Sequence, residues 1–205
     1  QAFLSPGPRR YLQIETRFLS DDPLLAAQLD ALTLSFYPPL VTRTVAEISP
    51  AIAIPAKPVR LTYVLHVEPN VNDVGFDEIE ITASTDMKFE TVRRDGEPIS
   101  ASATETEGGF RLQLEEHLRQ EALLEIDFES TIFVNQTRFD AVLFNSTLGE
   151  EVRQRVDEGD ASTLVANETV AVSLPAAPGL LRDLQLSTRV LTPNADGVND
   201  EMRIH

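Results

Sequence analysis

Hydrophobic and polar residues alternate with a period of two over much of the chain. The clearest stretch covers residues 59–68: one face carries Val59, Leu61, Tyr63, Leu65 and Val67, and the other carries Arg60, Thr62, His66 and Glu68. In a β-strand successive side chains point to opposite faces of the sheet. This alternation is therefore typical of a strand with one buried and one solvated face.

Similar patterns predict further strands. They cover residues 11–19, 32–36, 76–81, 110–114, 124–128, 139–144, 152–156 and 170–174. Residues 89–92 and Ile99 flank Asp95-Gly96, and Asp-Gly readily adopts the positive φ angles of a tight turn, so this part predicts a β-hairpin. Gly108-Gly109 separates that hairpin from the next strand, and residues 115–122 are expected to form a short turn or helix.

The order of these elements indicates the fold class. The strands follow one another about every ten residues, with turn signals between them and almost no helical periodicity. A parallel α/β sheet would need crossover helices, which this pattern does not provide. We therefore predict an all-β fold, an antiparallel β-sandwich of the immunoglobulin-like or jelly-roll-like kind.

Proline divides the chain into expected parts. Pro38, Pro39, Pro50, Pro55 and Pro58 fall within 21 residues, and proline supplies no hydrogen-bond donor to a sheet. We expect residues 43–58 to be an extended connector or sheet-edge segment. Residues 1–42 would be an N-terminal part or the closing strands of a preceding sandwich, and residues 59–188 the main sandwich domain.

Composition narrows the classes of partner. Among 205 residues, 33 are acidic and 17 basic, so the formal charge is −16 at pH 7. Such a chain repels phosphate backbones, which makes nucleic acid a poor partner. It contains no cysteine, which excludes disulfides and thiol nucleophiles. No apolar run approaches the roughly 20 residues that span a bilayer, and the hydrophobic fraction of 42% supports a core.

Catalytic signatures are missing from the sequence. His66, His117 and His205 have no second histidine at metal-ligand spacing, and neither H-E-x-x-H nor G-x-S-x-G occurs. Carboxylate pairs are frequent, as chance predicts for so acidic a chain. Residues 157–160 (Asp-Glu-Gly-Asp) fit a solvated loop better than a second cation-binding turn. We therefore predict that the chain is not an enzyme.

One stretch near the end of the chain is rich in candidate metal ligands. Residues 192–200 read Thr-Pro-Asn-Ala-Asp-Gly-Val-Asn-Asp, and Asn194, Asp196, Asn199 and Asp200 surround Gly197. Short oxygen-bearing side chains around a glycine suit calcium. The same side chains also form turns that bond the local backbone and need no metal. Both interpretations remain open, and calcium is the cofactor that this stretch would hold.

This stretch resembles the T-P-N-G-D-G-x-N-D opening of C-terminal immunoglobulin-like modules in secreted and surface bacterial proteins. Those modules include the gliding-motility-associated C-terminal domain and the FlgD-like module. The resemblance covers about the last fifteen residues, and Ala195 replaces the usual glycine. It implies an exported bacterial protein in which residues 189–205 would begin such a module, so that the chain would end inside it. Residues 10–39 show a weaker resemblance to the closing strands of discoidin-like or laminin-G-like sandwiches.

Three functional hypotheses follow. The first is a non-enzymatic segment of an exported multidomain bacterial protein, located outside the cell, on its surface or on the periplasmic side. It would act in surface attachment, spacing or assembly, with other domains or a surface protein as partners. The second is a carbohydrate-binding or accessory region of a secreted hydrolase, with a groove of aromatic residues such as Tyr11, Phe36, Tyr37 or Tyr63. The third is a peripheral extracytoplasmic subunit of a larger complex.

Overall fold

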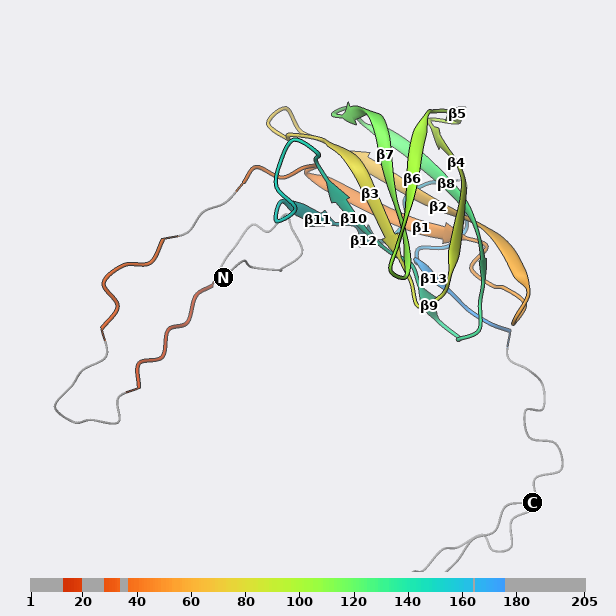
Figure 1. The fold of residues 1–205 in the computed structure, drawn as a ribbon, viewed down its shortest axis with the longest axis horizontal. Helices are drawn as coiled ribbons and strands as arrows, with labels where there is room; N and C mark the ends of the chain where they lie inside the picture. The colour runs from red at the N-terminus through yellow and green to blue at the C-terminus, as the bar shows by residue number, and fades with distance from the viewer. Residues whose placement is uncertain (1–12, 20–27, 34–36, 164, 176–205) are drawn as a thin grey trace, which may run out of the picture. The chain divides into compact units, whose positions relative to one another are not determined.

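The regular structure of the chain consists of β-strands. The computed structural model describes residues 13–19, 28–33, 37–163 and 165–175 (Figure 1). Its strands are β1 (Arg43–Ser49), β2 (Pro58–Glu68), β3 (Phe76–Thr82), β4 (Met87–Arg94), β5 (Glu97–Pro98), β6 (Ala101–Thr106), β7 (Gly109–Leu118), β8 (Ala122–Thr131), β9 (Thr137–Arg138), β10 (Asp140–Phe144), β11 (Arg153–Arg155), β12 (Asp157–Glu158) and β13 (Ala171–Val172). The described part of the chain contains no helix long and apolar enough to cross a membrane.

These strands form two facing sheets. The first has six strands in the order β12-β1-β2-β8-β4-β5, the second has five in the order β11-β10-β3-β7-β6, and β13 and β9 form a small pair. Every named strand pair is antiparallel except β1 with β12. Figure 1 shows the two sheets as separate layers. The predicted antiparallel β-sandwich is thus confirmed.

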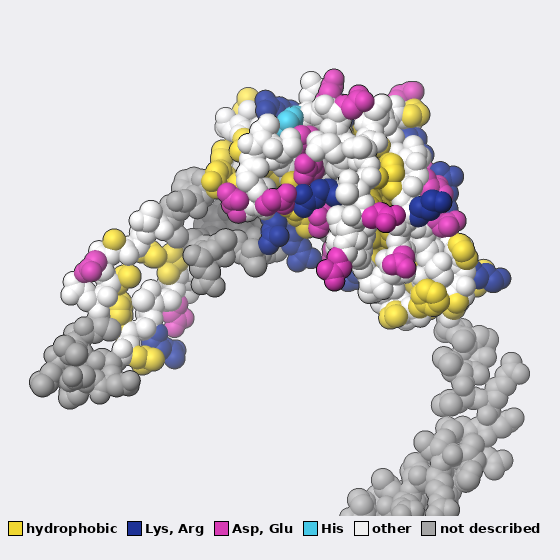
Figure 2. All heavy atoms as spheres, in the orientation of Figure 1, with side chains coloured by type: hydrophobic (Ala, Val, Ile, Leu, Met, Phe, Trp, Pro, Cys, Tyr) yellow, Lys and Arg dark blue, Asp and Glu magenta, His cyan; other side chains and the backbone are white. Residues whose placement is uncertain are grey.

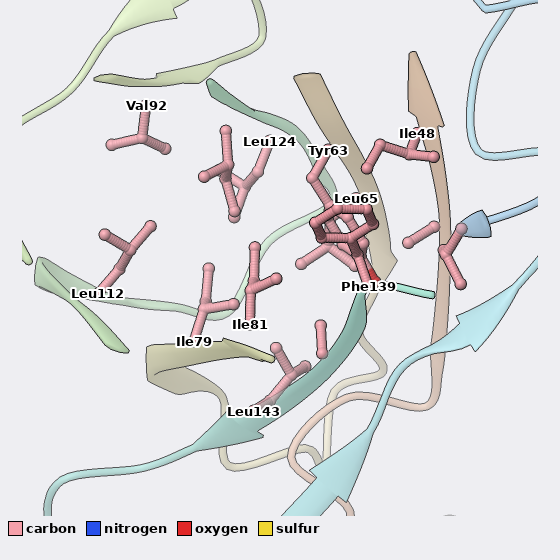
Figure 3. Packing of buried hydrophobic residues seen from close by; sticks show 14 of the residues in the cluster. Ile48, Tyr63, Leu65, Ile79, Ile81, Val92, Leu112, Leu124, Phe139 and Leu143 are labelled. Carbon is pink, nitrogen blue, oxygen red and sulfur yellow. The ribbon is translucent and has the colours of Figure 1, made fainter. Parts of the chain in front are cut away.

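The core fills the space between the two sheets. Side chains from both layers converge there, among them Tyr63 and Leu65 of β2 and Ile79 and Ile81 of β3 (Figure 3). Four phenylalanines form a continuous row through this core: the ring centroids of Phe89 and Phe110 are 5.7 Å apart, those of Phe110 and Phe128 5.6 Å, and those of Phe128 and Phe139 5.4 Å. All members of the core cluster lie between residues 40 and 172, so the sandwich carries its own core.

Two tight turns connect neighbouring strands. Asp95 (φ 52°) and Gly96 (φ 85°) join β4 to β5, which confirms the predicted hairpin. Glu107 and Gly108 join β6 to β7. At Gly109 a side chain would place its Cβ 1.9 Å from the carbonyl oxygen of Ile81, so only glycine fits. The predicted separation at Gly108-Gly109 is therefore a hairpin turn between two strands of one sheet.

The predicted strand over residues 11–19 is wrong in its described part. Residues 13–19 have no strand pairing, and every one of them is exposed. Residues 28–33, which include the start of the predicted strand at 32–36, are likewise exposed and unpaired. Alternation makes a segment suitable for a sheet, but a strand also needs hydrogen bonds from a neighbour. The remaining residues of both predictions lie outside the described ranges.

Two other expectations also need correction. Residues 43–49 belong to the segment predicted as an extended connector or a sheet-edge segment. They are not a connector: they form β1, which pairs with β2 over its whole length and with the short strand β12 at Val45 and Ala46. Thr44, Ala46 and Ile48 are buried there, because their alternation matches the inner face of the sheet. The turn or helix expected at residues 115–122 is largely strand, because β7 continues to Leu118 and β8 begins at Ala122.

Glu47 of β1 is a fully buried carboxylate. The Ser162 hydroxyl donates to its Oε1 at 3.0 Å, whereas Oε2 has no hydrogen-bond partner among the described residues. Burial raises the pKa of Glu47, and hydrogen bonds from Ser162 and Ala161 offset this only in part. An ionised carboxylate in this position therefore destabilises the fold.

We expect Glu47→Gln to be more stable than the natural protein at pH 7, by about 1 kcal/mol. Because the folded pKa is raised, Glu47 contributes its stability at pH values below the unfolded pKa of about 4.3 and loses it as pH rises through the folded pKa. Urea unfolding at pH 4 and pH 7 measures this difference. The exposed Glu97→Gln is the control, and equal stability of Glu47→Gln and the natural protein at pH 7 would contradict the expectation.

Candidate interaction surface

One end of the sandwich is built from three segments that are far apart in sequence. Pro58 pairs with Thr131 where β2 begins and β8 ends, so the residues before β2 and after β8 meet at the same end. The Ala56 N–H donates to the Ile132 carbonyl at 3.0 Å, and the Ala53 N–H donates to the Ser173 carbonyl at 3.0 Å. These backbone bonds hold residues 51–56, 132–136 and 173–174 side by side.

This end exposes four large apolar side chains. Their exposed fractions are 64% for Ile52, 58% for Ile54, 68% for Phe133 and 61% for Val134. Figure 2 shows hydrophobic side chains gathered at the end of the sandwich where Figure 1 places β9 and β13. Single exposed apolar residues are normal, but adjoining ones mark interaction sites. We call Ile52, Ile54, Phe133 and Val134 the end surface.

The chain's only two lysines lie beside the end surface. The Lys57 N–H donates to the Ile54 carbonyl at 3.4 Å, in the turn that precedes β2. Lys88 lines the same open hollow as Phe133, and both lysine residues are exposed. In a chain of formal charge −16, two ammonium groups next to apolar side chains make this end chemically distinct.

The hollow beside Phe133 carries several polar groups. Thr85, Asp86, Lys88 and Glu129 contribute to its lining. The Thr85 hydroxyl donates to the Thr131 carbonyl at 2.7 Å, which ties the loop before β4 to the end of β8. No histidine lines this hollow. An aromatic ring beside several polar groups is a combination that suits ligand binding.

A second polar cluster brings together the residue types of a serine hydrolase triad. The Ser146 N–H donates to Asp77 Oδ1 at 2.8 Å, and the Ser146 hydroxyl donates to Asp77 Oδ2. His117 Nε2 lies 3.1 Å from Asn145 Oδ1 and 3.5 Å from Asp77 Oδ2. Burial alone would raise the pKa of Asp77, but the hydrogen bonds from Ser146 lower it. Because the hydroxyl donates to the carboxylate instead of the imidazole, Ser146 is not activated as a nucleophile.

The structure places the sequence-predicted residues as follows. Asn194, Asp196, Asn199, Asp200 and His205 lie outside the described residues, so calcium at the terminal stretch stays a prediction. Within the described ranges, no group of three or more histidine, aspartate or glutamate residues could hold a metal ion.

Two of the predicted positions differ from expectation. His117 belongs to strand β7 and not to a turn. Asp157 and Glu158 form the short strand β12, which pairs with β1, so the stretch 157–160 is only partly a loop. In β12, Glu158 accepts a hydrogen bond from Arg138 at 2.9 Å. This carboxylate therefore serves the packing of the sheet edge.

The sequence analysis missed the end surface. The sequence did contain a signal for this surface, namely apolar residues directly before turn-forming residues. Ile52 and Ile54 precede Pro55, and Phe133-Val134 precede Asn135. Period-two alternation assigns such residues to strand interiors. Only the tertiary structure shows that Ile52 and Ile54 come before the first paired residue of β2, that Phe133 and Val134 come after the last paired residue of β8, and that both pairs lie at the same end.

The fold and this surface define a β-sandwich module with an exposed apolar end. No protein-family profile matches the chain, and no curated protein sequence does. Among solved structures, it is similar to the N-terminal domain of the Streptococcus gordonii adhesin Sgo0707, with a TM-score of 0.46, 14% identity and coverage of 67% of this chain and 34% of the adhesin chain. It thus spans about a third of that structure.

Two further structures show weaker similarity. A cohesin module from a Clostridium perfringens family 33 glycoside hydrolase has a TM-score of 0.37 and 9% identity, with 64% of this chain and 95% of the cohesin covered. A putative membrane-anchored protein from Corynebacterium diphtheriae has a TM-score of 0.36 and 13% identity, with 62% and 38% covered. Because each TM-score is below 0.5, these similarities support no inference about function.

Proposed function

We propose that this chain is a non-catalytic segment of an exported multidomain bacterial protein, acting in surface attachment or assembly by binding a protein partner. The observation that carries the proposal is the end surface, where Ile52, Ile54, Phe133 and Val134 are more than half exposed. Export is supported by the resemblance of residues 192–200 to modules of secreted bacterial proteins. An acidic chain without cysteine is compatible with such a location.

The end surface defines the chemistry of its partner. Fully burying an aliphatic or phenylalanine side chain contributes about 1.5–3 kcal/mol, and four of them offset part of the cost of association. Lys57 at the rim favours a carboxylate on the opposite surface, whereas Lys88 shares its hollow with Asp86 and Glu129. The partner is therefore a protein surface with an apolar patch flanked by aspartate or glutamate.

A site-specific crosslink in the source organism tests this function. With Phe133 replaced by the photo-crosslinker p-benzoylphenylalanine, we expect one discrete adduct between this chain and a second protein, resolved by mass spectrometry. Val71 is the matched control position, because it is 91% exposed and follows β2 at the opposite end of the sandwich. Equal adduct patterns from the two positions, or crosslinks only within the chain, would overturn the proposal.

A specific observation favours a second candidate function, the binding of a carbohydrate. Phe133 lies beside a hollow lined by Thr85, Asp86 and Glu129, and sugars stack on exposed aromatic rings while polar groups bond their hydroxyls. The aromatic groove expected from the sequence is wrong at Tyr63, which is buried in the core, whereas Tyr37 is exposed. Tyr11 and Phe36 lie outside the described residues.

Variants at the same end separate the two candidates. Ile52→Ser with Ile54→Ser removes half of the apolar end surface without touching the hollow, so it should abolish a protein adduct and leave glycan binding intact. Asp86→Asn with Glu129→Gln alters the hollow and should have the opposite effect. Affinity electrophoresis in soluble polysaccharide gives the glycan readout. A fixed-stoichiometry complex recovered from the source would instead favour a peripheral subunit of a larger assembly.

A further inference from the structure

Within the described part of the chain, strand β6 leaves one edge of the five-stranded sheet open. It pairs with β7 from Ala101 opposite Leu114 to Thr106 opposite Gly109, and it is the last strand in the sheet order. Its sequence, Ala-Ser-Ala-Thr-Glu-Thr, contains neither proline nor lysine, two residues that often protect such edges, and Glu105 is its one charged residue. An edge of this kind can accept another strand through backbone hydrogen bonds.

The inner face of β6 is also uncovered. Ala103 and Glu105 share a face with Leu112 and Phe110, their partners in β7, yet both are exposed while those partners are buried. Phe89, whose ring lies 5.7 Å from that of Phe110, is only partly buried. Larger apolar side chains on an added strand would therefore extend the core at this edge.

The same chain contains a strand-like segment that pairs with no other described residue. Residues 13–19 alternate Ile14, Thr16 and Phe18 with Gln13, Glu15 and Arg17, and all seven residues are exposed. Among the described residues, their side chains make one ion pair, a local one between Arg17 and Glu15. The polar face has no net charge, so it adds no repulsion next to Ser102, Thr104 and Thr106 of β6.

The place where the chain after this segment enters the sandwich helps to decide whether the segment pairs with β6 of its own copy or of a second copy. Gln154 of β11 accepts hydrogen bonds from the N–H groups of Leu40 and Val41, both at 3.1 Å. Strand β11 is the opposite edge of the sheet from β6. Because the chain that follows the segment enters the sandwich at the edge opposite β6, pairing of the segment with β6 of a second copy gives head-to-tail contacts, which continue from one copy to the next.

We propose that residues 13–19 of one copy add as an antiparallel strand to β6 of a second copy. In this register Phe18 lies opposite Ala103, where its ring covers the exposed edge of the core. Thr16 lies opposite Glu105, where its hydroxyl is next to the Glu105 carboxylate. In the same register Arg17 lies opposite Thr104 on the outer face. This self-association does not involve the end surface. A negative result in its test therefore leaves the proposed function untouched, and the reverse also holds.

Engineered cysteines test the pairing directly, because the chain has none of its own. Side chains directly opposite in neighbouring strands have Cβ atoms about 4.5–5.5 Å apart, within disulfide range or close to it. A mixture of Arg17→Cys and Thr104→Cys chains should form mixed disulfide dimers on mild oxidation. A mixture of Arg17→Cys and Val71→Cys is the control. Equal yields in both mixtures would overturn the proposal.

Two further measurements cover the alternatives. The double variant Arg17→Cys/Thr104→Cys should give intermolecular products; a crosslinked monomer would mean that the segment pairs within its own chain and would overturn the two-copy assignment. Light scattering after gel filtration should show concentration-dependent assembly, weakened at least about tenfold by Ile14→Ser with Phe18→Ser. The control, Gln13→Ser with Glu15→Ser, should keep it. A monomer at every concentration contradicts the proposal.

Discussion

Phe128→Ala is expected to lower the free energy of unfolding by about 3–5 kcal/mol, the range for truncating a buried phenylalanine. Phe128 is fully buried in β8, and its ring contacts those of Phe110 on the facing sheet and Phe139. Its removal leaves a cavity in the middle of the aromatic row. Since domains of this size are stable by about 5–15 kcal/mol, urea unfolding should show a large shift of the midpoint.

Phe133→Ala is the matched control for this variant. It deletes the same atoms only a few residues away, but Phe133 is 68% exposed. Its effect on unfolding should stay within about 0.5 kcal/mol, as for most surface substitutions. If the two variants lost similar stability, or if Phe128→Ala lost less than about 1 kcal/mol, the sandwich core would not be organised around this row.

Asp127→Ala is expected to cost about 3 kcal/mol at pH 7, because it removes the common acceptor of a buried network. Asp127 lies on the outer face of the six-stranded sheet and is 2% exposed. Its carboxylate accepts hydrogen bonds from the Thr62 hydroxyl at 2.6 Å, from Arg93 at 2.7 Å and from Arg60 at 3.1 Å. Truncation leaves the part-buried Arg93 and Thr62 groups without this partner.

The pH dependence of this effect has a definite sign. Burial alone would raise the pKa of Asp127, but hydrogen bonds from Thr62 and Arg93 and the charges of Arg93 and Arg60 lower it. A lowered folded pKa means that the stabilisation is present above the unfolded pKa of about 3.9 and is lost as pH falls through the folded pKa. The difference between Asp127→Ala and the natural protein should therefore narrow below about pH 4.

Unfolding curves at pH 7 and pH 3 measure this change, with Asp157→Ala as an exposed control. Asp157 also lies in a strand of the six-stranded sheet, but its side chain is exposed and forms no hydrogen bond with another described residue. Its removal should have little effect at either pH. A cost for Asp127→Ala that is equally large in acid would mean that packing, and not the ionised carboxylate, stabilises this part of the sheet.

Local features of the sequence predicted well where the physical cause was itself local. The turn at Asp95-Gly96 depends on two residues that tolerate positive φ, and it forms where expected. The alternation of residues 59–68 also placed Leu61, Tyr63 and Leu65 in the core. The same rule failed for residues 13–19, whose alternation is as regular but which have no paired neighbour within the described chain.

By itself, the sequence determined the all-β class, the antiparallel architecture, the main hairpin and the acidic, cysteine-free character of the protein. These properties follow from backbone preferences, the period of the side chains and the count of charges. The tertiary structure alone decided that residues 43–49 pair with β2. It also decided that Asp127 accepts hydrogen bonds from Thr62, Arg93 and Arg60. Finally, it placed the exposed side chains of Ile52 and Phe133 at one end of the sandwich. Each depends on which strands become neighbours, and strand pairing between distant segments is set by the packing of the whole core.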